Sequence, residues 1–245
     1  MHKIESSQNP FVKHLVRLQN DASYRQEMQK ALVEGEKTIQ EILPYTASGT
    51  LFSQQLPEFN FPPAFRWIQI SESVENKISE TDSANKVFGE FPLPVPPVHL
   101  KVRRLLALDG VSDPGNLGTL MRTALGLGWD AVFFLPGCCD PFNGKAIRAS
   151  KGAAFKLPFQ KGDWEDLEKI IKANNLSPLA ADLEGKRPAC QKDDSIVLVL
   201  GNEGQGLSEK TRERCEKICL PMRGDMESLN VAAAGAILMY VLRHQ

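Results

Sequence analysis

The chain has 245 residues, of which 42% are hydrophobic and 24% are charged, a composition that excludes disordered, collagen-like and coiled-coil proteins. Lys and Arg number 29 against 30 Asp and Glu, so the formal net charge is −1 and any surface that binds nucleic acid must be local. The 5 cysteines have no framework spacing, and neither a secretory signal nor an apolar run of membrane-spanning length is present. These features favour a cytoplasmic protein without a membrane partner.

Residues 1–91 predict a small α+β module. A helical pattern of apolar residues begins at Val12, and a second one begins at Thr38. Residues 51–70 alternate short apolar stretches with prolines, which predicts small strands and loops. Residues 92–99 contain prolines that cannot join a helix or a central strand, so we place a stiff linker and a domain boundary there.

Residues 100–245 alternate predicted strands and helices, which indicates an α/β fold with a parallel sheet and helices on both faces. The predicted strands are residues 105–108, 132–135, 196–200 and 218–220. The predicted helices are residues 117–125 with Asn116 as cap and Gly126 and Gly128 as end, 145–150, 164–173, a short charged helix capped by Ser208, and 229–242. The last helix is apolar on all sides, which predicts that it is buried.

Three polar, glycine-containing loops follow predicted strands, at residues 109–116, 201–206 and 221–230. In an open parallel sheet the ligand crevice lies beyond the carboxyl ends of the strands. Each loop alone is explained by a tight turn, but three at one edge favour a binding site. No dinucleotide or phosphate-loop fingerprint is present, and all four histidines lie outside these loops, so neither a metal site nor a histidine-based triad is expected.

The same loops carry a resemblance to a known family. Residues 116–122, residues 200–207, and residues 220–222 with 228–231 resemble, in order, the three motifs of the SpoU family of RNA ribose 2′-O-methyltransferases, in the SPOUT superfamily. Residues 6–18 and 33–39 are similar to the ribosomal-protein-like RNA-binding module that many members carry. The resemblance implies domains at 1–91 and 100–245, a C-terminal trefoil knot, S-adenosylmethionine as cofactor, no metal, and a homodimer formed through the catalytic domain.

The resemblance also implies the site residues. The catalytic set is Arg122, Asn116, Glu203, Ser228 and Asn230. The cofactor-binding set is Gly201, Leu220, Leu229, Leu200, Gly204, Pro221 and Met222, which would act largely through backbone groups and apolar contact.

Purely structural roles are alternatives for several of these residues. Arg122 is either the base that takes the ribose 2′-hydroxyl proton or a clamp on a phosphate, and its firmly held proton makes the first role awkward. Asn116 and Ser228 are also suited to helix capping, and Glu203 either orients Arg122 or is solvated. Asn230 precedes an apolar helix and needs a polar partner.

Local basic residues are the predicted RNA contacts. Lys145, Arg148 and Lys151 lie in a stretch without an acidic residue, which suits phosphate binding, although a charge run is usually a solvated face. Arg25, beside Tyr24, is expected to stack on exposed bases.

The leading interpretation is an enzyme that methylates a ribose 2′-hydroxyl in structured RNA, with ribosomal RNA as the expected target. A tRNA ribose 2′-O-methyltransferase, a non-catalytic knotted RNA-binding assembly factor and a small-molecule α/β enzyme remain alternatives. S-adenosylmethionine binding without metal and the identity of the methylated nucleoside separate them.

Overall fold

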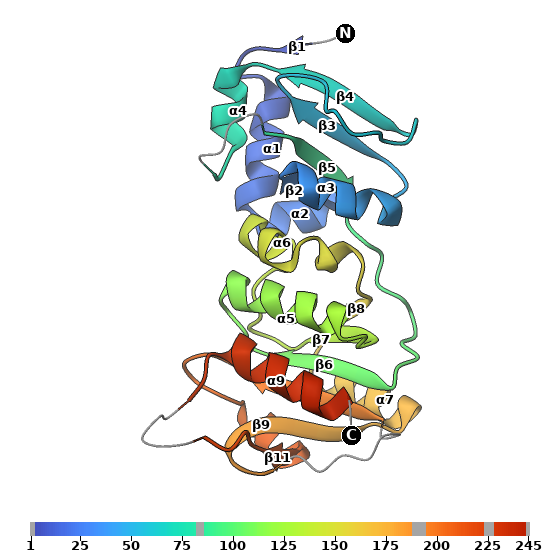
Figure 1. Cartoon of the computed structure of the whole chain (residues 1–245), viewed down its shortest axis with the longest axis vertical. Coiled ribbons are helices and arrows are strands. Elements are labelled where there is room, and N and C mark those ends of the chain that lie inside the picture. Colours follow the sequence, from blue (N-terminus) through green and yellow to red (C-terminus); the bar gives the residue numbers. More distant parts are fainter. Residues whose placement is uncertain (1–2, 82–85, 188–194, 223–227, 244–245) are drawn as a thin grey trace. The chain divides into compact units, whose positions relative to one another are not determined.

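The computed structural model describes residues 3–81, 86–187, 195–222 and 228–243 (Figure 1). The chain folds into two compact units, Met1–Val95 with Asp140–Lys156, and Pro96–Cys139 with Leu157–Gln245. Among the described helices, none combines the length and the apolar character that crossing a bilayer requires.

The first unit contains a five-stranded mixed sheet. Its strands, in sheet order, are β1 (Lys3–Ile4), β4 (Phe65–Ile70), β3 (Gly49–Ser53), β5 (Phe88–Pro92) and β2 (Lys30–Glu34). β1, β4 and β3 run parallel, and β5 is antiparallel to both β3 and β2. Strands therefore do occupy the region where apolar stretches alternate with prolines.

The helices of the first unit are α1 (Pro10–Asn20), α2 (Ala22–Met28), α3 (Glu36–Ile42) with the 3₁₀ turn η1 (Leu43–Tyr45), and α4 (Glu72–Ile78). α1 begins where Asn9 accepts a hydrogen bond from the Phe11 N–H at 2.9 Å and Pro10 takes the first helical position. Its residues Val12, Leu15 and Leu18 are buried with side chains from α4 and the sheet. The two predicted helices of this part are thus confirmed.

Residues 140–156 pack within the first unit, although they follow the proline-containing linker in sequence. They form α6 (Gly144–Ser150) and the 3₁₀ turn η2 (Ala153–Phe155). Phe155 packs edge-on against Phe91 of β5 and Phe142, with ring centroids 6.3 and 5.4 Å apart. The compact units describe which residues pack together and do not test where the domains begin and end in sequence. The domain division 1–91, 92–99 and 100–245 therefore stays a prediction.

The second unit is built on a six-stranded sheet in which every pair is parallel. Its strands, in sheet order, are β11 (Glu216–Ile218), β9 (Ser177–Lys186), β10 (Ile196–Gly201), β6 (Arg104–Asp109), β7 (Ala131–Phe134) and β8 (Phe159–Lys161). The chain runs outward from β6 to β8 and then returns to the other side of β6. β6 and β10 therefore flank the point where the strand order reverses.

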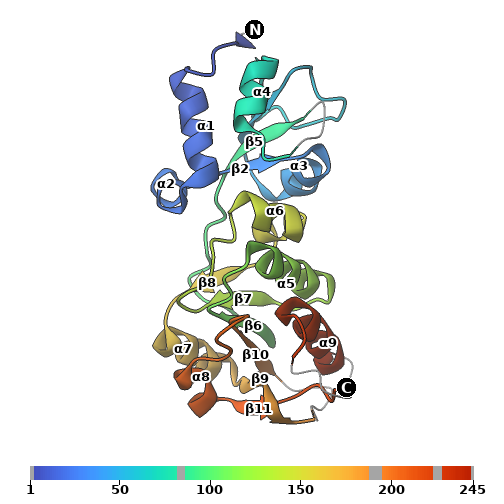
Figure 2. The ribbon, with the colours of Figure 1, turned by 90° about the vertical axis from the view of Figure 1, so that its left-hand side faces the viewer.

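Helices cover both faces of this sheet, as predicted. α5 (Pro114–Gly126) and α9 (Val231–Arg243) pack together on one face, and α7 (Trp164–Asn174) and α8 (Glu209–Arg214) lie on the other (Figure 2). Leu105 and Val197, on neighbouring strands, pack with Trp164 and Leu167 of α7. Alternate strand residues face α5 and α9, since a Cβ on Gly235 of α9 would meet Leu200 at 2.5 Å.

Several details of the second unit differ from the predictions. α5 is capped by Asp113, not Asn116, because Pro114 fits only the first helical turn and fixes its start. α9 is not buried on all sides, since Ile237 is 45% exposed and Tyr240 is 56% exposed. The long strand β9 was not predicted, and β11 ends two residues before Leu220.

A buried carboxylate fixes α8 to the end of β6. Asp109 is 8% exposed and accepts hydrogen bonds from the Ser208 N–H at 2.9 Å and the Thr211 hydroxyl at 2.5 Å. The Thr211 oxygen in turn accepts from the Trp164 indole N–H at 3.1 Å. Ser208 caps α8, which confirms that prediction.

Replacing Thr211 with the nearly isosteric valine should lower the free energy of unfolding by about 1–3 kcal/mol, because Asp109 and Trp164 both lose a buried partner. Urea denaturation measures the change. Thr123→Val is the control, since among the described residues that hydroxyl donates only to Thr119 O in its own helix. Equal effects of the two substitutions would contradict this role for Thr211.

Candidate active site

The predicted site loops leave the carboxyl ends of β6 and β10 at the reversal of strand order. In open α/β sheets ligands bind at this position, because the two loops diverge there and leave a crevice. The loop after β6 contains Ser112 and Asp113, and the loop after β10 contains Asn202 and Glu203. Their side chains hold the loops together.

Glu203 is the centre of this connection. One carboxylate oxygen accepts from the Ser112 N–H and hydroxyl, both at 3.2 Å. The other accepts from the Asp113 N–H at 3.2 Å and the Asn116 amide at 3.1 Å. Asn202 adds a link in the same direction by donating to Gly110 O at 2.7 Å.

The third loop joins through Asn230. Its side-chain amide donates to Asn116 Oδ1 at 3.0 Å, and its own oxygen accepts from the Ala232 N–H at 2.9 Å at the start of α9. Asn230 therefore has the polar partner that the sequence required. Asn116 bridges Glu203 and Asn230, so all three loops meet through side chains.

The backbone of the loop after β10 folds back on itself. Asn202 and Gly206 exchange backbone hydrogen bonds, both 2.9 Å long. A Cβ on Gly201 would lie 2.6 Å from the Gly206 backbone, so a larger residue would displace this loop. Gly206 has a φ of +71°, a conformation that favours glycine.

A pocket of about 770 Å³ opens beside these loops. Six of the seven predicted cofactor-binding residues line it, namely Leu200, Gly201, Gly204, Leu220, Met222 and Leu229. So do four of the five predicted catalytic residues, namely Asn116, Glu203, Ser228 and Asn230. Positions 223–227 of the third loop lie outside the described residues.

Two predicted residues stand apart from this pocket. Pro221 is not among its described lining residues, and neither is Arg122, which is exposed on α5. Arg122 follows Asn116 by six residues, about 9 Å along the helix and roughly two-thirds of a turn around it. The structure thus unites the loop residues and leaves the guanidinium outside their pocket.

Sequence reasoning missed one wall of the pocket. Ala181, Asp182, Leu183 and Glu184 of β9 contribute to it, together with Lys217 of β11. Asp182 is 3.5 Å from Lys217. The apolar pair Leu179–Ala180 was the available signal, but Pro178 and the acidic residues that follow obscured the strand.

Electrostatics keep Glu203 in its charged form. Partial burial raises the pKa of Glu203, but hydrogen bonds from Asn116 and from the backbone N–H groups of Glu203, Ser112 and Asp113 outweigh it, so the pKa lies below its ordinary value. A carboxylate with a lowered pKa is a weak base. Glu203 is therefore suited to positioning the loops.

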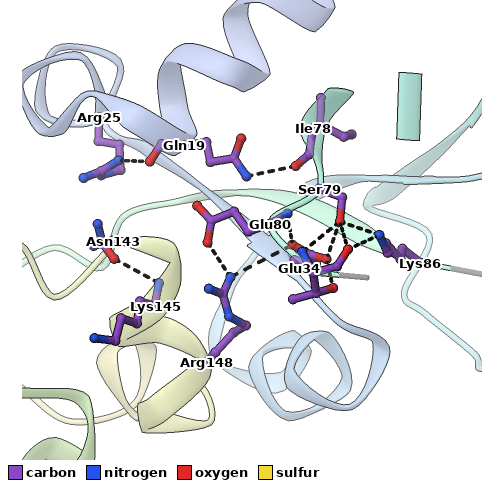
Figure 3. A network of polar contacts seen from close by, with 11 residues as sticks. Gln19, Arg25, Glu34, Ile78, Ser79, Glu80, Lys86, Asn143, Lys145 and Arg148 are labelled. Atoms are coloured by element: carbon purple, nitrogen blue, oxygen red, sulfur yellow. Dashed lines mark hydrogen bonds and ion pairs between the residues drawn. The ribbon is translucent and has the colours of Figure 1, made fainter. Parts of the chain in front are cut away.

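The predicted RNA contacts all lie in the first unit. Arg25 is 2% exposed; its guanidinium contacts Asp140 at 2.7 Å and donates to Leu18 O at 2.6 Å. It also donates to Gln19 O at 2.9 Å (Figure 3). This burial leaves no face of Arg25 accessible to a base, so the structure does not support the predicted stacking of Arg25 on RNA bases. Arg148 donates to Glu80 at 2.5 Å, whereas Lys145 and Lys151 are exposed.

Cysteine and metal chemistry find little support in the described residues. Burial raises the pKa of the Cys138 thiol to about 11 and that of Cys215 to about 12, so both stay protonated at neutral pH. Within the ranges that the structure describes, no group of three or more His, Cys, Asp or Glu side chains is arranged to hold a metal ion.

Comparison with known proteins adds to the geometry. The SpoU rRNA methylase family matches residues 103–240, and the MRM3-like substrate binding domain matches residues 9–89. The 23S rRNA (guanosine(2553)-2′-O)-methyltransferase RlmP of Bacillus subtilis is 31% identical over 99% of this chain and 100% of its own length.

Two solved structures share the whole architecture. The AdoMet-bound rRNA methyltransferase from Sinorhizobium meliloti has a TM-score of 0.85 and 28% identity, over 98% of this chain and 97% of that one. A putative RNA methyltransferase of the TrmH family from Porphyromonas gingivalis has a TM-score of 0.84 and 30% identity, over 95% and 96%.

The parallel sheet, its pocket at the reversal of strand order and the attached substrate-binding domain are the architecture of an α/β enzyme. The chain belongs to the SpoU rRNA methylase family. It is therefore an RNA methyltransferase, and the resemblance seen in its three motifs is confirmed.

Glu203→Gln should destabilise the protein at neutral pH, because an amide nitrogen replaces one of the two acceptor oxygens. The pKa of Glu203 is lowered on folding from its ordinary 4.5, so its stabilising contribution is complete above that pH and is lost as pH falls through the lower folded value. Denaturation between pH 3 and 7 should show the two proteins converging in acid. Glu58→Gln controls for the loss of one charge, and a pH-independent difference would contradict the assignment.

Proposed function

We propose that this protein transfers a methyl group from S-adenosylmethionine to a ribose 2′-hydroxyl of ribosomal RNA. The observation that carries the proposal is the joining of three loops by Glu203, Asn116 and Asn230 beside a pocket in a SpoU-family chain. The relative from Bacillus subtilis, whose name specifies 23S rRNA, matches the full length of this chain and supports rRNA over tRNA as the target.

The pocket has the chemistry that this cofactor needs. Leu220 and Leu229, with Leu200 beneath them in β10, offer apolar surface for an adenine ring, and the exposed backbone of Gly204 is open to polar groups of the ligand. The carboxylates of Asp182 and Glu203 suit the cofactor's ribose hydroxyls and its positive charge. When bound, S-adenosylmethionine supplies a methyl group that is already electrophilic. The chain's residues need only bind it, exclude water and align the acceptor.

Arg122 acts on the RNA in this proposal. Its side chain is exposed and outside the described lining of the cofactor pocket, so it is free to contact the target nucleotide. A guanidinium holds its proton too firmly for an efficient base. Its planar fork fits a phosphate and stabilises negative charge that develops on the 2′-oxygen. We therefore favour the clamp over the base.

Three finer features belong to the same proposal. The C-terminal segment forms a trefoil knot, as the family resemblance implies. The protein forms a homodimer through its catalytic domain, for which the exposed apolar side chains of Leu229, Ile237 and Tyr240 provide a surface. It works in the cytoplasm, where ribosomal RNA is available.

The direct test is methyl transfer to RNA from a strain that lacks the gene. Labelled S-adenosylmethionine, the protein and separately purified rRNA and tRNA are incubated without added metal, and the products are digested to nucleosides. A 2′-O-methyl nucleoside in the rRNA is expected. Label on a base, or label only in tRNA, would contradict the proposal.

Arg122→Lys should lower kcat by on the order of a hundredfold or more, because a point charge cannot reproduce the planar two-pronged contact. Affinity for S-adenosylmethionine, measured by calorimetry, should stay unchanged. Thr123→Ala on the same helix is the control and should leave kcat intact. Loss of cofactor affinity in Arg122→Lys would instead place Arg122 in the cofactor site.

A further inference from the structure

We propose that a pocket in the first unit binds one unpaired nucleotide of the RNA substrate, an inference that rests on the proposed function. The pocket has a volume of about 910 Å³ and is lined by Glu34 at the end of β2, by α3 and the η1 turn, by residues 86–87 just before β5, and by Arg148, Lys151 and Lys156. We call it the α3 pocket. It shares no lining residue with the pocket beside Glu203, and its size is within the range of small-molecule sites.

Two of the three carboxylates in the lining of the α3 pocket are already occupied. Glu34 accepts from the Ser79 hydroxyl and the Glu80 N–H, both at 2.9 Å (Figure 3). Glu41 pairs with Lys156, which lowers the pKa of that carboxylate. Arg148, 4.0 Å from Glu34, and Lys156 offset the charges of these two carboxylates, whereas Glu36 accepts only from the Gln40 amide at 3.2 Å among the described contacts and keeps its charge. The lining has five cations, Lys37, Lys86, Arg148, Lys151 and Lys156, against these three carboxylates, so its formal charge is positive.

Two of the pocket's cations, Lys37 and Lys151, are accessible to a ligand, whereas two others are held inside the unit. Lys86 is 8% exposed and bound inside the unit, and Arg148 is engaged by Glu80. Lys37 and Lys151 are exposed and form no ion pair with any carboxylate in the described part of the chain. Two accessible ammonium groups on one concave surface are suited to a phosphodiester backbone.

The backbone at Lys151 supports a binding role for its side chain. Lys151 ends α6 with a φ of +48°, in the left-handed region that favours glycine or asparagine. A lysine there costs stability that glycine would save. Such costs are found where a side chain is needed for function.

An aromatic ring lies on the same surface. Tyr45 ends the η1 turn and is 58% exposed, and the Lys156 ammonium lies 5.3 Å from its ring centroid. An exposed ring beside cations is the arrangement with which proteins stack single-stranded bases. A base can reach such a ring only when it is not paired. The ligand class is therefore a single-stranded nucleotide within the RNA.

The charge part of the proposal is tested with Lys37→Gln combined with Lys151→Asn, in which asparagine tolerates the left-handed backbone. The probe is rRNA from a strain lacking the gene, with binding measured over a range of salt concentrations. We expect about tenfold weaker binding and a log–log salt slope smaller by about 0.7 for each lysine removed. Lys13→Gln, an exposed lysine on α1, is the matched control.

The stacking part is tested with Tyr45→Ala and Tyr45→Phe. The alanine variant should bind the rRNA about tenfold more weakly with an unchanged salt slope, whereas the phenylalanine variant keeps the ring and the affinity. Calorimetry with S-adenosylmethionine should give the same affinity for all variants, since its pocket lies in the other unit, and unchanged urea denaturation should show that the first unit is folded.

Three outcomes are decisive. Binding of every pocket variant at the level of Lys13→Gln would overturn the proposal. Binding of guanosine monophosphate as tight as that of the RNA, lost on Tyr45→Ala, would also overturn it and make the pocket a mononucleotide site. Wild-type protein that binds rRNA through these residues but transfers no methyl group would support the α3 pocket and refute the proposed function.

Discussion

The candidate site depends on a single ionised carboxylate that lies among hydrogen-bond donors from another loop. Glu203 takes all four of its interloop hydrogen bonds from Ser112, Asp113 and Asn116. A carboxylate held this way cannot move without leaving several donors unpaired. Asn116 also accepts a hydrogen bond from Asn230, which precedes α9, so the contacts of Glu203 with the first loop also position the start of the last helix. Two asparagines 114 positions apart in the chain thus belong to one polar network.

The parallel sheet explains why this network lies where it does. Every strand of the second unit has its carboxyl end at the same edge, and β6 and β10 are neighbours there. The buried Asp109 at the end of β6 fixes the opposite side of the second loop through Ser208 and Thr211. Two carboxylates, one buried and one partly exposed, therefore fix the loop after β10 at both ends.

Local patterns in the sequence carried much of the fold and of the loop set. The apolar spacing after Val12 and the continuous run at residues 196–200 correspond to α1 and β10. β9 was missed because Pro178 and Asp182 break the apolar run, and its pairing with β10 compensates only after folding. The site residues were found through motifs, since hydrogen bonds between Glu203 and residues 112–116 leave no periodic signal in the sequence.

The basic stretch that follows residue 144 also shows that contacts between residues distant in sequence cannot be predicted from local patterns. Lys145, Arg148 and Lys151 were assigned to RNA, but the carboxylate of Glu80 occupies Arg148, and that of Glu41 occupies the nearby Lys156. Pairs separated by 68 and 115 residues depend on the tertiary fold alone. Lys151, which forms no ion pair within the described residues, remains accessible to a ligand, and counting charges in the sequence cannot make this distinction.

The packing of residues 140–156 also has a practical consequence for dissecting the molecule. A fragment that starts after the prolines would keep Asp140 and Phe155 but lose Arg25 and Phe91, their partners in the first unit. It would expose an apolar patch and an unpaired carboxylate to solvent, and would be prone to aggregate during expression. The catalytic half of this polypeptide is therefore best isolated together with the segment that precedes it.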